Sequence, residues 1–309
     1  MSEDKKVEET KKKASFPAGS MNALLIIGQE VLEKLEDPAF HYHLKPGYDA
    51  RKALNAACDK MSHREETASC TRDSISLALK DMFLQALDPA TNQCYLIPQY
   101  NKMLGKMEMT LKRSYFGTMA AVKDLCPEIR EINAACVWSD EKFAYGYKMG
   151  KFCSTVHELD PDKPYDSHED LSKMRYVYVE IYGENGKLIA SEMMTGAQVK
   201  TAWLQSNNVQ KDKATGTKSL KADSTHLMFS SEMAKRSVIN RACKNILNTM
   251  TVSEDKREMY EAYKRTLDNE FLDENQKPEK ESPKEEPEGG TEGSPQPSSM
   301  AEKMLKLGN

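Results

Sequence analysis

The stretch EMTLKRSYFGTMAAVKDLCPEIREIN, residues 108–133, changes its pattern twice and decides the fold class. Apolar and polar residues alternate through MEMTLKRSYF, residues 107–116, which predicts a β-strand. The following GTMAAVKDLC has helical character and ends before Pro127, and EINAACVW, residues 131–138, predicts a second strand. Helices and strands therefore alternate within one domain.

The flanking segments extend this pattern in both directions. Residues 22–37, 48–61 and 71–87 predict three helices, the last with Thr71 as its N-cap. Three further segments complete the prediction: a hairpin formed by residues 131–138 and 142–150, a hairpin over residues 175–194 with an Asn185-Gly186 type I′ turn, and a long amphipathic helix over residues 226–249.

We therefore predict an α+β fold with a helical N-terminal part, central antiparallel hairpins forming a β-sheet, and a long closing amphipathic helix. Lys/Glu-rich residues 1–18 predict a disordered N-terminal tail. The expected core covers residues 19–252, and residues 253–309 are expected to form an acidic, flexible tail because they become rich in Glu, Lys, Pro, Gly and Ser.

Composition favours a soluble, cytoplasmic protein. The longest apolar run, residues 23–27, is far too short to span a bilayer and has no cleavage site after it. Seven cysteines with irregular spacing and no CxxC pair predict neither a disulfide framework nor a zinc site. Four of them have apolar neighbours and are expected to be buried free thiols: Cys58, Cys126, Cys136 and Cys243.

Charge is unevenly distributed along the chain, whose net charge is −4. Residues 254–309 hold 15 acidic and nine basic residues, whereas residues 200–244 hold nine basic and three acidic residues. A basic segment on a mildly basic body with an acidic tail is typical of a nucleic-acid-binding protein. A solvated surface without any partner would have the same charge pattern, so charge alone leaves both interpretations open.

Signatures of nucleotide hydrolysis are missing from the sequence. GENGK, residues 183–187, lacks the spacing of a phosphate loop, and there is no GxGxxG, HExxH or nucleophile elbow. We expect no catalytic residue, no cofactor and no metal. The acidic stretch VHELDPDKPYDSHED, residues 156–170, keeps a metal-dependent nuclease as an alternative, although two prolines and few apolar residues favour a solvated loop.

Two segments hold cations that could bind nucleic acid, and the first also holds aromatic side chains. Lys112 and Arg113 precede Tyr115 and Phe116, a combination that suits single-stranded nucleic acid, whose phosphates need charge and whose bases stack on rings. The alternative is that these rings belong to the core. Lys235 lies on the apolar stripe of the closing helix, where it either borders the core or contacts phosphates. Arg236 borders the same stripe, and Arg241 and Lys244 lie on the other side.

Four motifs in sequence order resemble the RecT/Red-beta family of phage single-strand annealing proteins, over roughly residues 35–252. They are ALDPATNQCYLIPQYNK, LKRSYFGTMAAV, YVYVEIYGENG and EMAKRSVINRACKNI. The second resembles the family's GY[RK]G step from strand to helix, with Tyr115 and Gly117 in the matching positions. It departs from that step because Ser114 replaces the first glycine and Phe116 replaces the cation.

The resemblance implies which residues contact DNA. Lys235 and Arg236 match the paired cations that line a narrow DNA groove in the family, Arg241 matches the next basic position, and Lys102 matches the NK lysine. The complete set of expected DNA-binding residues is Lys102, Lys112, Arg113, Tyr115, Lys235, Arg236, Arg241 and Lys244.

The resemblance also implies a function in DNA recombination. Such a protein anneals single strands without ATP, stabilises the new duplex in a homo-oligomeric ring or filament, and works with a partner exonuclease. A passive single-stranded DNA-binding protein stays open as a second alternative. Met300, Met304 and Leu307 fall on one face of a short C-terminal helix, a candidate docking peptide for a host single-stranded DNA-binding protein. A disordered end with a chance stripe is equally consistent with so few turns.

Overall fold

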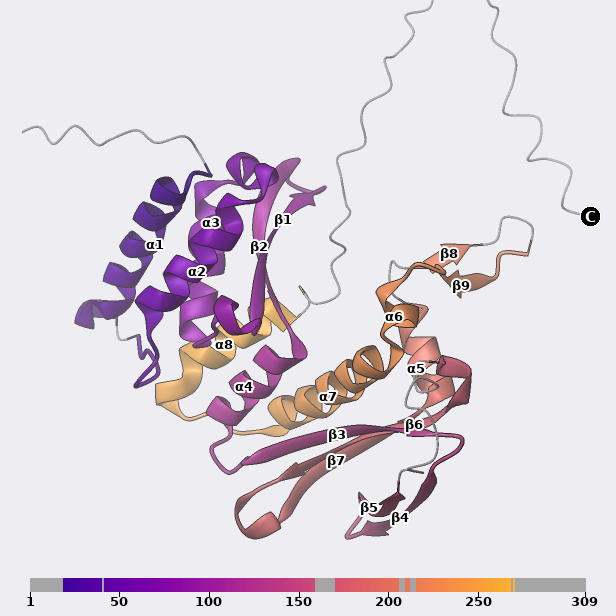
Figure 1. Ribbon diagram of the computed structural model, residues 1–309. Helices are drawn as coiled ribbons and strands as arrows, with labels where there is room; N and C mark the ends of the chain where they lie inside the picture. Colours follow the sequence, from indigo (N-terminus) through magenta and orange to yellow (C-terminus); the bar gives the residue numbers. More distant parts are fainter. Residues whose placement is uncertain are drawn as a thin grey trace, which may run out of the picture. The chain divides into compact units, whose positions relative to one another are not determined.

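A computed structural model describes residues 19–40, 42–158, 170–205, 209–211, 215–267 and 269 (Figure 1). Within these residues the fold is α+β with antiparallel sheets, as predicted. Residues 1–18, most of the acidic stretch, and the candidate docking peptide lie outside the described residues. None of the helices in the described ranges is both long enough and apolar enough to cross a membrane.

Three helices and a hairpin form the first hydrophobic cluster. The helices are α1 (Met21–Glu36), α2 (Ala50–Ser62) and α3 (Arg72–Leu84), and the antiparallel strands are β1 (Cys94–Asn101) and β2 (Lys106–Arg113). Thr71 caps α3 as predicted, because its hydroxyl accepts a hydrogen bond from the Ser74 amide at 3.3 Å. Leu24, Leu79 and Phe83 are completely buried where the three helices meet.

A second cluster forms between α7 (Ser230–Thr249) and a three-stranded sheet of order β3–β6–β7. The strands are β3 (Glu131–Trp138), β6 (Met174–Tyr182) and β7 (Leu188–Thr195), all antiparallel. Val177, Val179 and Ile181 alternate along β6 and are fully buried in this cluster. The helix α4 (Tyr115–Leu125) packs along α7, so β2 passes into α4 where the two clusters adjoin (Figure 1).

The opposite face of β6 packs on aromatic side chains. Strands β4 (Lys142–Lys148) and β5 (Lys151–Glu158) form their own antiparallel hairpin, and Phe152 and Tyr178 are buried between it and β6. The predicted pairing of residues 131–138 with 142–150 is therefore wrong, because β3 pairs with β6 instead. The predicted β6–β7 hairpin is confirmed: Asn185 and Gly186 have φ values of 58° and 68°, and the Lys187 amide closes the turn on the Glu184 carbonyl.

Smaller elements complete the described chain. The helix α5 (Gly196–Trp203) begins with a capping box made by Thr195 and Gln198, and the Trp203 indole donates to Ser237 of α7 at 2.9 Å. The other short elements are β8 (Val209–Lys211), β9 (Lys218–Leu220), α6 (Thr225–Met228) and 3₁₀ turns at Pro38–Phe40, Glu65–Ser69, Pro89–Thr91, Leu171–Lys173, Glu184–Gly186 and Glu254–Lys256.

The ordered chain continues beyond the expected limit at residue 252. The helix α8 (Arg257–Leu267) follows, and its two faces belong to different clusters: Ala262 is buried in the first and Tyr263 in the second. Sequence composition missed this helix because it is rich in charged residues, but its buried positions recur at helical spacing. The expectation that a flexible tail begins at residue 253 is thus corrected.

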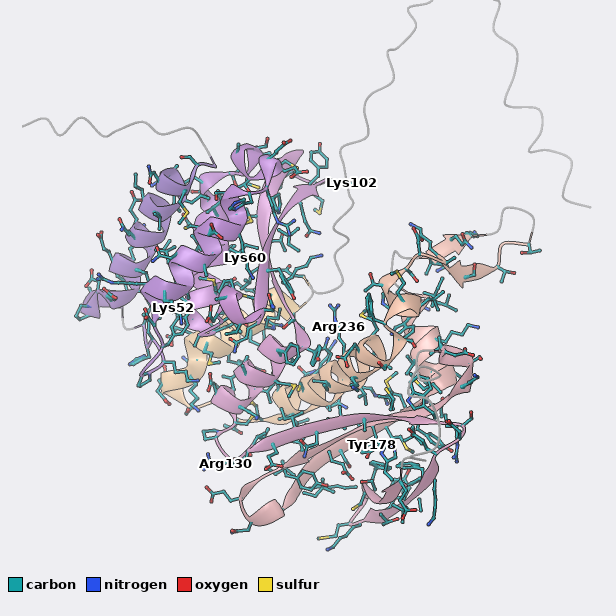
Figure 2. The ribbon with its side chains drawn as sticks, viewed as in Figure 1. Lys52, Lys60, Lys102, Arg130, Tyr178 and Arg236 are labelled. Atoms are coloured by element: carbon teal, nitrogen blue, oxygen red, sulfur yellow. The ribbon has the colours of Figure 1, made fainter. Side chains whose placement is uncertain are left out.

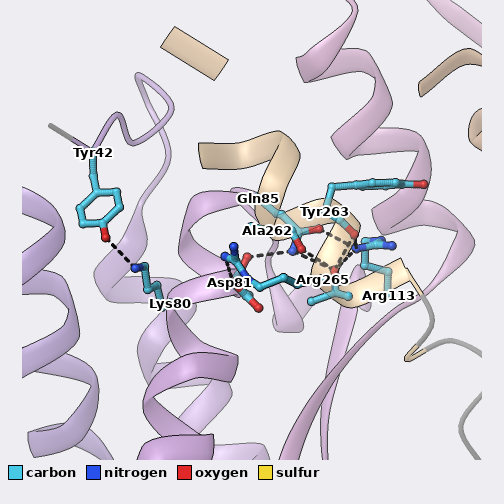
Figure 3. A network of polar contacts seen from close by, with 9 residues as sticks. Tyr42, Lys80, Asp81, Gln85, Arg113, Ala262, Tyr263 and Arg265 are labelled. Atoms are coloured by element: carbon cyan, nitrogen blue, oxygen red, sulfur yellow. Dashed lines mark hydrogen bonds and ion pairs between the residues drawn. The ribbon is translucent and has the colours of Figure 1, made fainter. Parts of the chain in front are cut away.

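A buried arginine attaches α8 to the rest of the fold (Figure 3). The Arg113 guanidinium donates to the Gln85 side-chain oxygen at 2.8 Å, to the Tyr263 carbonyl at 3.3 Å, and to the Thr266 hydroxyl. It also stacks over the Tyr263 ring at 4.0 Å. Beside it, Arg265 donates to Asp81 at 2.5 Å. These contacts join β2, α3 and α8.

The four expected buried thiols are confirmed. Cys58, Cys126, Cys136 and Cys243 are all buried. Burial raises the pKa of the Cys58 thiol to about 12, and burial together with Glu128 raises that of Cys126 to about 11. Both thiols therefore stay protonated at neutral pH, which makes them inert as nucleophiles.

We expect Arg113→Met to lower the free energy of unfolding by about 2–4 kcal/mol, because it leaves the buried Gln85 side-chain oxygen without its donor and removes the hydrogen bonds to Tyr263 and Thr266. Urea denaturation followed by circular dichroism measures the change. Arg241→Met is the matched control, since the exposed Arg241–Glu192 pair contributes less than about 1 kcal/mol. Equal stability of the two variants would contradict a structural role for Arg113.

Candidate nucleic-acid interface

The junction of β2 and α4 positions two aromatic side chains. Ser114 caps α4 by accepting the Gly117 amide at 3.2 Å, so Tyr115 and Phe116 occupy the first turn. A Cβ atom at Gly117 would lie 2.0 Å from the Gln93 carbonyl oxygen. The glycine therefore permits close approach of α4 to the turn before β1, which holds the two rings in a fixed place.

Phe116 presents the exposed ring of this pair. It is 51% exposed, and its centroid lies 4.0 Å from that of Tyr115. A shallow hollow surrounds it, lined by Thr91, Gln93, Phe116, Met119, Ala120 and Lys123. An exposed ring beside a lysine offers a base its stacking surface and a phosphate its charge. Of the two rings named from the sequence, Phe116 is thus the more exposed.

Tyr115 instead turns toward α7. Its hydroxyl donates to one Glu232 carboxylate oxygen at 2.8 Å, and Lys235 donates to the other at 3.0 Å. Burial raises the pKa of the Tyr115 hydroxyl, and the bond to Glu232 raises it further, so the hydroxyl remains a donor. Tyr115 and Lys235 were both expected to bind DNA, and the structure brings them together on one carboxylate.

Arg236 follows Lys235 on α7 and points away from the β3–β6–β7 sheet (Figure 2). It is partly exposed, and its charge acts on His226 of α6: burial lowers the pKa of His226, and the nearby guanidinium lowers it further. Arg236 and Lys235 therefore place two positive charges at adjacent positions near the start of α4, as a phosphate-binding surface requires.

The remaining cations of α7 lie elsewhere on the helix. Arg241 pairs with Glu192 of β7 at 3.2 Å, and Asn245 donates to the same carboxylate at 3.0 Å. Lys244 is exposed one turn further along. Arg241 is therefore directed toward β7 rather than toward the carboxylate that Tyr115 and Lys235 share.

The structure does not bring the other three expected DNA-binding residues to the contact between Tyr115 and Lys235. Arg113 is 1% exposed and Lys112 is 7% exposed, so neither offers its charge to a phosphate in this conformation. The strand alternation that put Lys112 on an open face failed because both faces of β2 are covered at this end. Lys102 is exposed at the tip of the β1–β2 hairpin (Figure 2), at the opposite end of eight-residue strands that span roughly 25 Å.

The sequence analysis did not identify two residues of the candidate site, Lys123 and Glu232. Lys123 lies two helical turns after Phe116 on the same face of α4, a spacing of i, i+7 that the sequence does contain. Glu232 had no such signal, because only the packing of α4 against α7 brings its carboxylate to Tyr115.

The metal alternative finds no support in the described ranges, which contain no group of three or more His, Cys, Asp or Glu side chains able to hold a metal. His157 instead lies 3.0 Å from the buried Glu141 carboxylate and 3.0 Å from the Tyr178 hydroxyl. Asp170 caps the turn that follows it by accepting the Ser172 amide. Residues 159–169, the centre of the acidic stretch, lie outside the described residues.

Adjacent cations and an exposed aromatic ring are typical of a protein that binds single-stranded nucleic acid. The cations suit its phosphates, and the ring suits its flat bases. The sequence model of the RecT family matches residues 51–280, about three quarters of the chain, and the chain therefore belongs to the RecT family. Membership implies a role in phage recombination by binding and annealing single-stranded DNA, and it confirms the resemblance of the four motifs. No curated protein matches the chain.

We expect Phe116→Ala to weaken binding of a single-stranded oligonucleotide by about 1–3 kcal/mol, because one stacking surface is lost. Fluorescence anisotropy with a labelled oligothymidylate measures the change, and the melting temperature should stay nearly constant since the ring is half exposed. Tyr147→Ala on β4 is the matched control, because that ring is 69% exposed and lies in another part of the fold. Equal losses in both variants would contradict a specific role for Phe116.

Proposed function

We propose that this protein anneals complementary DNA strands without ATP and stabilises the newly formed duplex within a homo-oligomer. The observation that carries the proposal is the placement of Lys235 and Arg236 beside the ring pair of α4, in a chain that belongs to the RecT family. One helix supplies charge for phosphates, and the neighbouring helix supplies a surface for bases.

The physical chemistry of annealing fits such a surface. Two complementary strands pair spontaneously, so a protein accelerates pairing by neutralising phosphates and by keeping bases accessible. Neither task needs a nucleophile, a general base or a nucleotide. We therefore propose that the protein is not an enzyme and has no cofactor.

The proposal extends to partners and location. We propose a ring or helical filament of identical subunits, a partner exonuclease that supplies the single strands, and a cytoplasmic site of action. The C-terminal end of the acidic tail, with Met300, Met304 and Leu307 at helical spacing, is proposed to contact a host single-stranded DNA-binding protein. The opposite charges of this acidic tail and the basic α7 segment support a role for the tail in tuning DNA binding.

The decisive experiment adds two complementary oligonucleotides to the purified protein one after the other, without ATP. Accelerated pairing with a stable complex on the duplex supports the proposal. Cleavage of either strand in the presence of Mg²⁺ would establish a nuclease instead. Protection of the first strand with no gain from the second would establish a passive binder.

Lys235→Ala and Arg236→Ala should each weaken binding of single-stranded DNA and slow annealing, with the fold intact. Because each removes one phosphate contact, the slope of log K against log salt concentration should fall by about 0.7 per variant. Arg130→Ala is the matched control, since this exposed arginine pairs with Glu184 at 2.5 Å and lies just before β3, away from Arg236 (Figure 2). Unchanged slopes in both α7 variants would contradict the phosphate assignment.

Truncation after Gln276, where the compact unit ends, should leave annealing of naked oligonucleotides unchanged, because α8 and the α4–α7 surface remain. The same truncation should slow annealing of strands coated with host single-stranded DNA-binding protein. Stopped-flow fluorescence compares the two rates in both proteins. Equal rates on coated strands would remove the tail from the mechanism.

A further inference from the structure

Glu232 occupies a position between two donors that come from different helices. The Tyr115 hydroxyl of α4 and the Lys235 ammonium of α7 each donate to a separate carboxylate oxygen, at 2.8 Å and 3.0 Å. The Glu232 side chain is 49% exposed and that of Lys235 is 31% exposed, so solvent and a ligand both reach this contact. Two oxygens of one anion thus bridge the two helices.

The charge state of the three groups is well defined. Partial burial raises the pKa of the Glu232 carboxyl, but hydrogen bonds from Lys235 and Tyr115 outweigh it, so the pKa lies below its usual range. Glu232 is therefore ionised at neutral pH. Lysine can only donate, and the Tyr115 hydroxyl is protonated, so the pair of donors is suited to an oxyanion.

A backbone phosphate of DNA is also an oxyanion with two available oxygens, and it would satisfy the same donors. We propose that Glu232 holds the place of a DNA phosphate on Tyr115 and Lys235, so that a strand must displace this carboxylate in order to bind. The inference rests on the proposed function and adds to it a residue that weakens binding. In this arrangement Tyr115 serves as a hydrogen-bond donor to phosphate rather than as a stacking ring.

Such a built-in competitor determines which anions bind. A free phosphate or a mononucleotide exchanges one oxyanion for another at this site and gains little. A DNA strand also brings a phosphate to Arg236 and a base to Phe116, and these contacts raise the local concentration of its next phosphate at the Glu232 position. Glu232 therefore favours a polymer over the small phosphates that are abundant in a cell.

The test compares Glu232→Gln with Glu184→Gln in the full-length protein, using a labelled oligothymidylate and fluorescence anisotropy. Both variants remove one carboxylate from an exposed ion pair, so the change in net charge is the same. Glu232→Gln should bind roughly three- to tenfold more tightly than the wild type, whereas Glu184→Gln should change little. If the wild type binds DNA and the two variants bind it with equal affinity, the proposed role of Glu232 is overturned. The proposed function of the protein would still stand.

A double-mutant cycle separates competition from general repulsion. In the wild type, Glu232 and the phosphate compete for the Lys235 ammonium. Replacing Lys235 by alanine removes this donor, so Glu232→Gln should raise the affinity for DNA much less in this background. A gain of full size in the Lys235→Ala background would assign the effect to long-range repulsion and would overturn the proposal. Circular dichroism and the melting temperature verify that each variant is folded. A wild type that binds no single-stranded DNA would instead overturn the proposed function itself.

Discussion

The Arg113 guanidinium is the interaction on which the rest of the structure depends. A charged group that is 1% exposed is tolerated only when hydrogen bonds and a ring face replace its hydration, and Gln85, Thr266 and Tyr263 provide these replacements. Two of the three partners lie on α8. The arginine therefore requires that helix, and the helix in turn holds Ala262 and Tyr263 in two different hydrophobic clusters.

The position of Arg113 in the sequence connects its contacts to the candidate nucleic-acid interface. Arg113 is the last residue of β2, and Ser114 directly after it caps α4. A guanidinium fixed from three elements fixes the start of α4, and with it the rings of Tyr115 and Phe116. Arg113, a cation that the sequence offered to phosphates, is instead buried and holds this junction in place.

Local signals made much of the fold predictable. The Thr71 cap and the Asn185-Gly186 turn depend on residues within a few positions of each other, so a single sequence contains the whole cause. The pairing of β3 with β6 and the packing of α8 depend on contacts between distant segments, which leave no trace in local periodicity. The same distinction applies to the candidate site: the sequence alone places Lys235 and Arg236 side by side on one helix. The burial of Lys112 and the role of Glu232 required the assembled fold.

The distance along the chain between Arg113 and Thr266, 153 residues, has a consequence for synthesis. Closing so long a loop is slow, and a chain emerging from the ribosome exposes β2 and α3 long before α8 exists. During that interval the Arg113 site is open to water and the first cluster lacks Ala262. The junction of β2 and α4 thus gains its full set of Arg113 contacts only after α8 docks, so this part of the fold is completed late in synthesis.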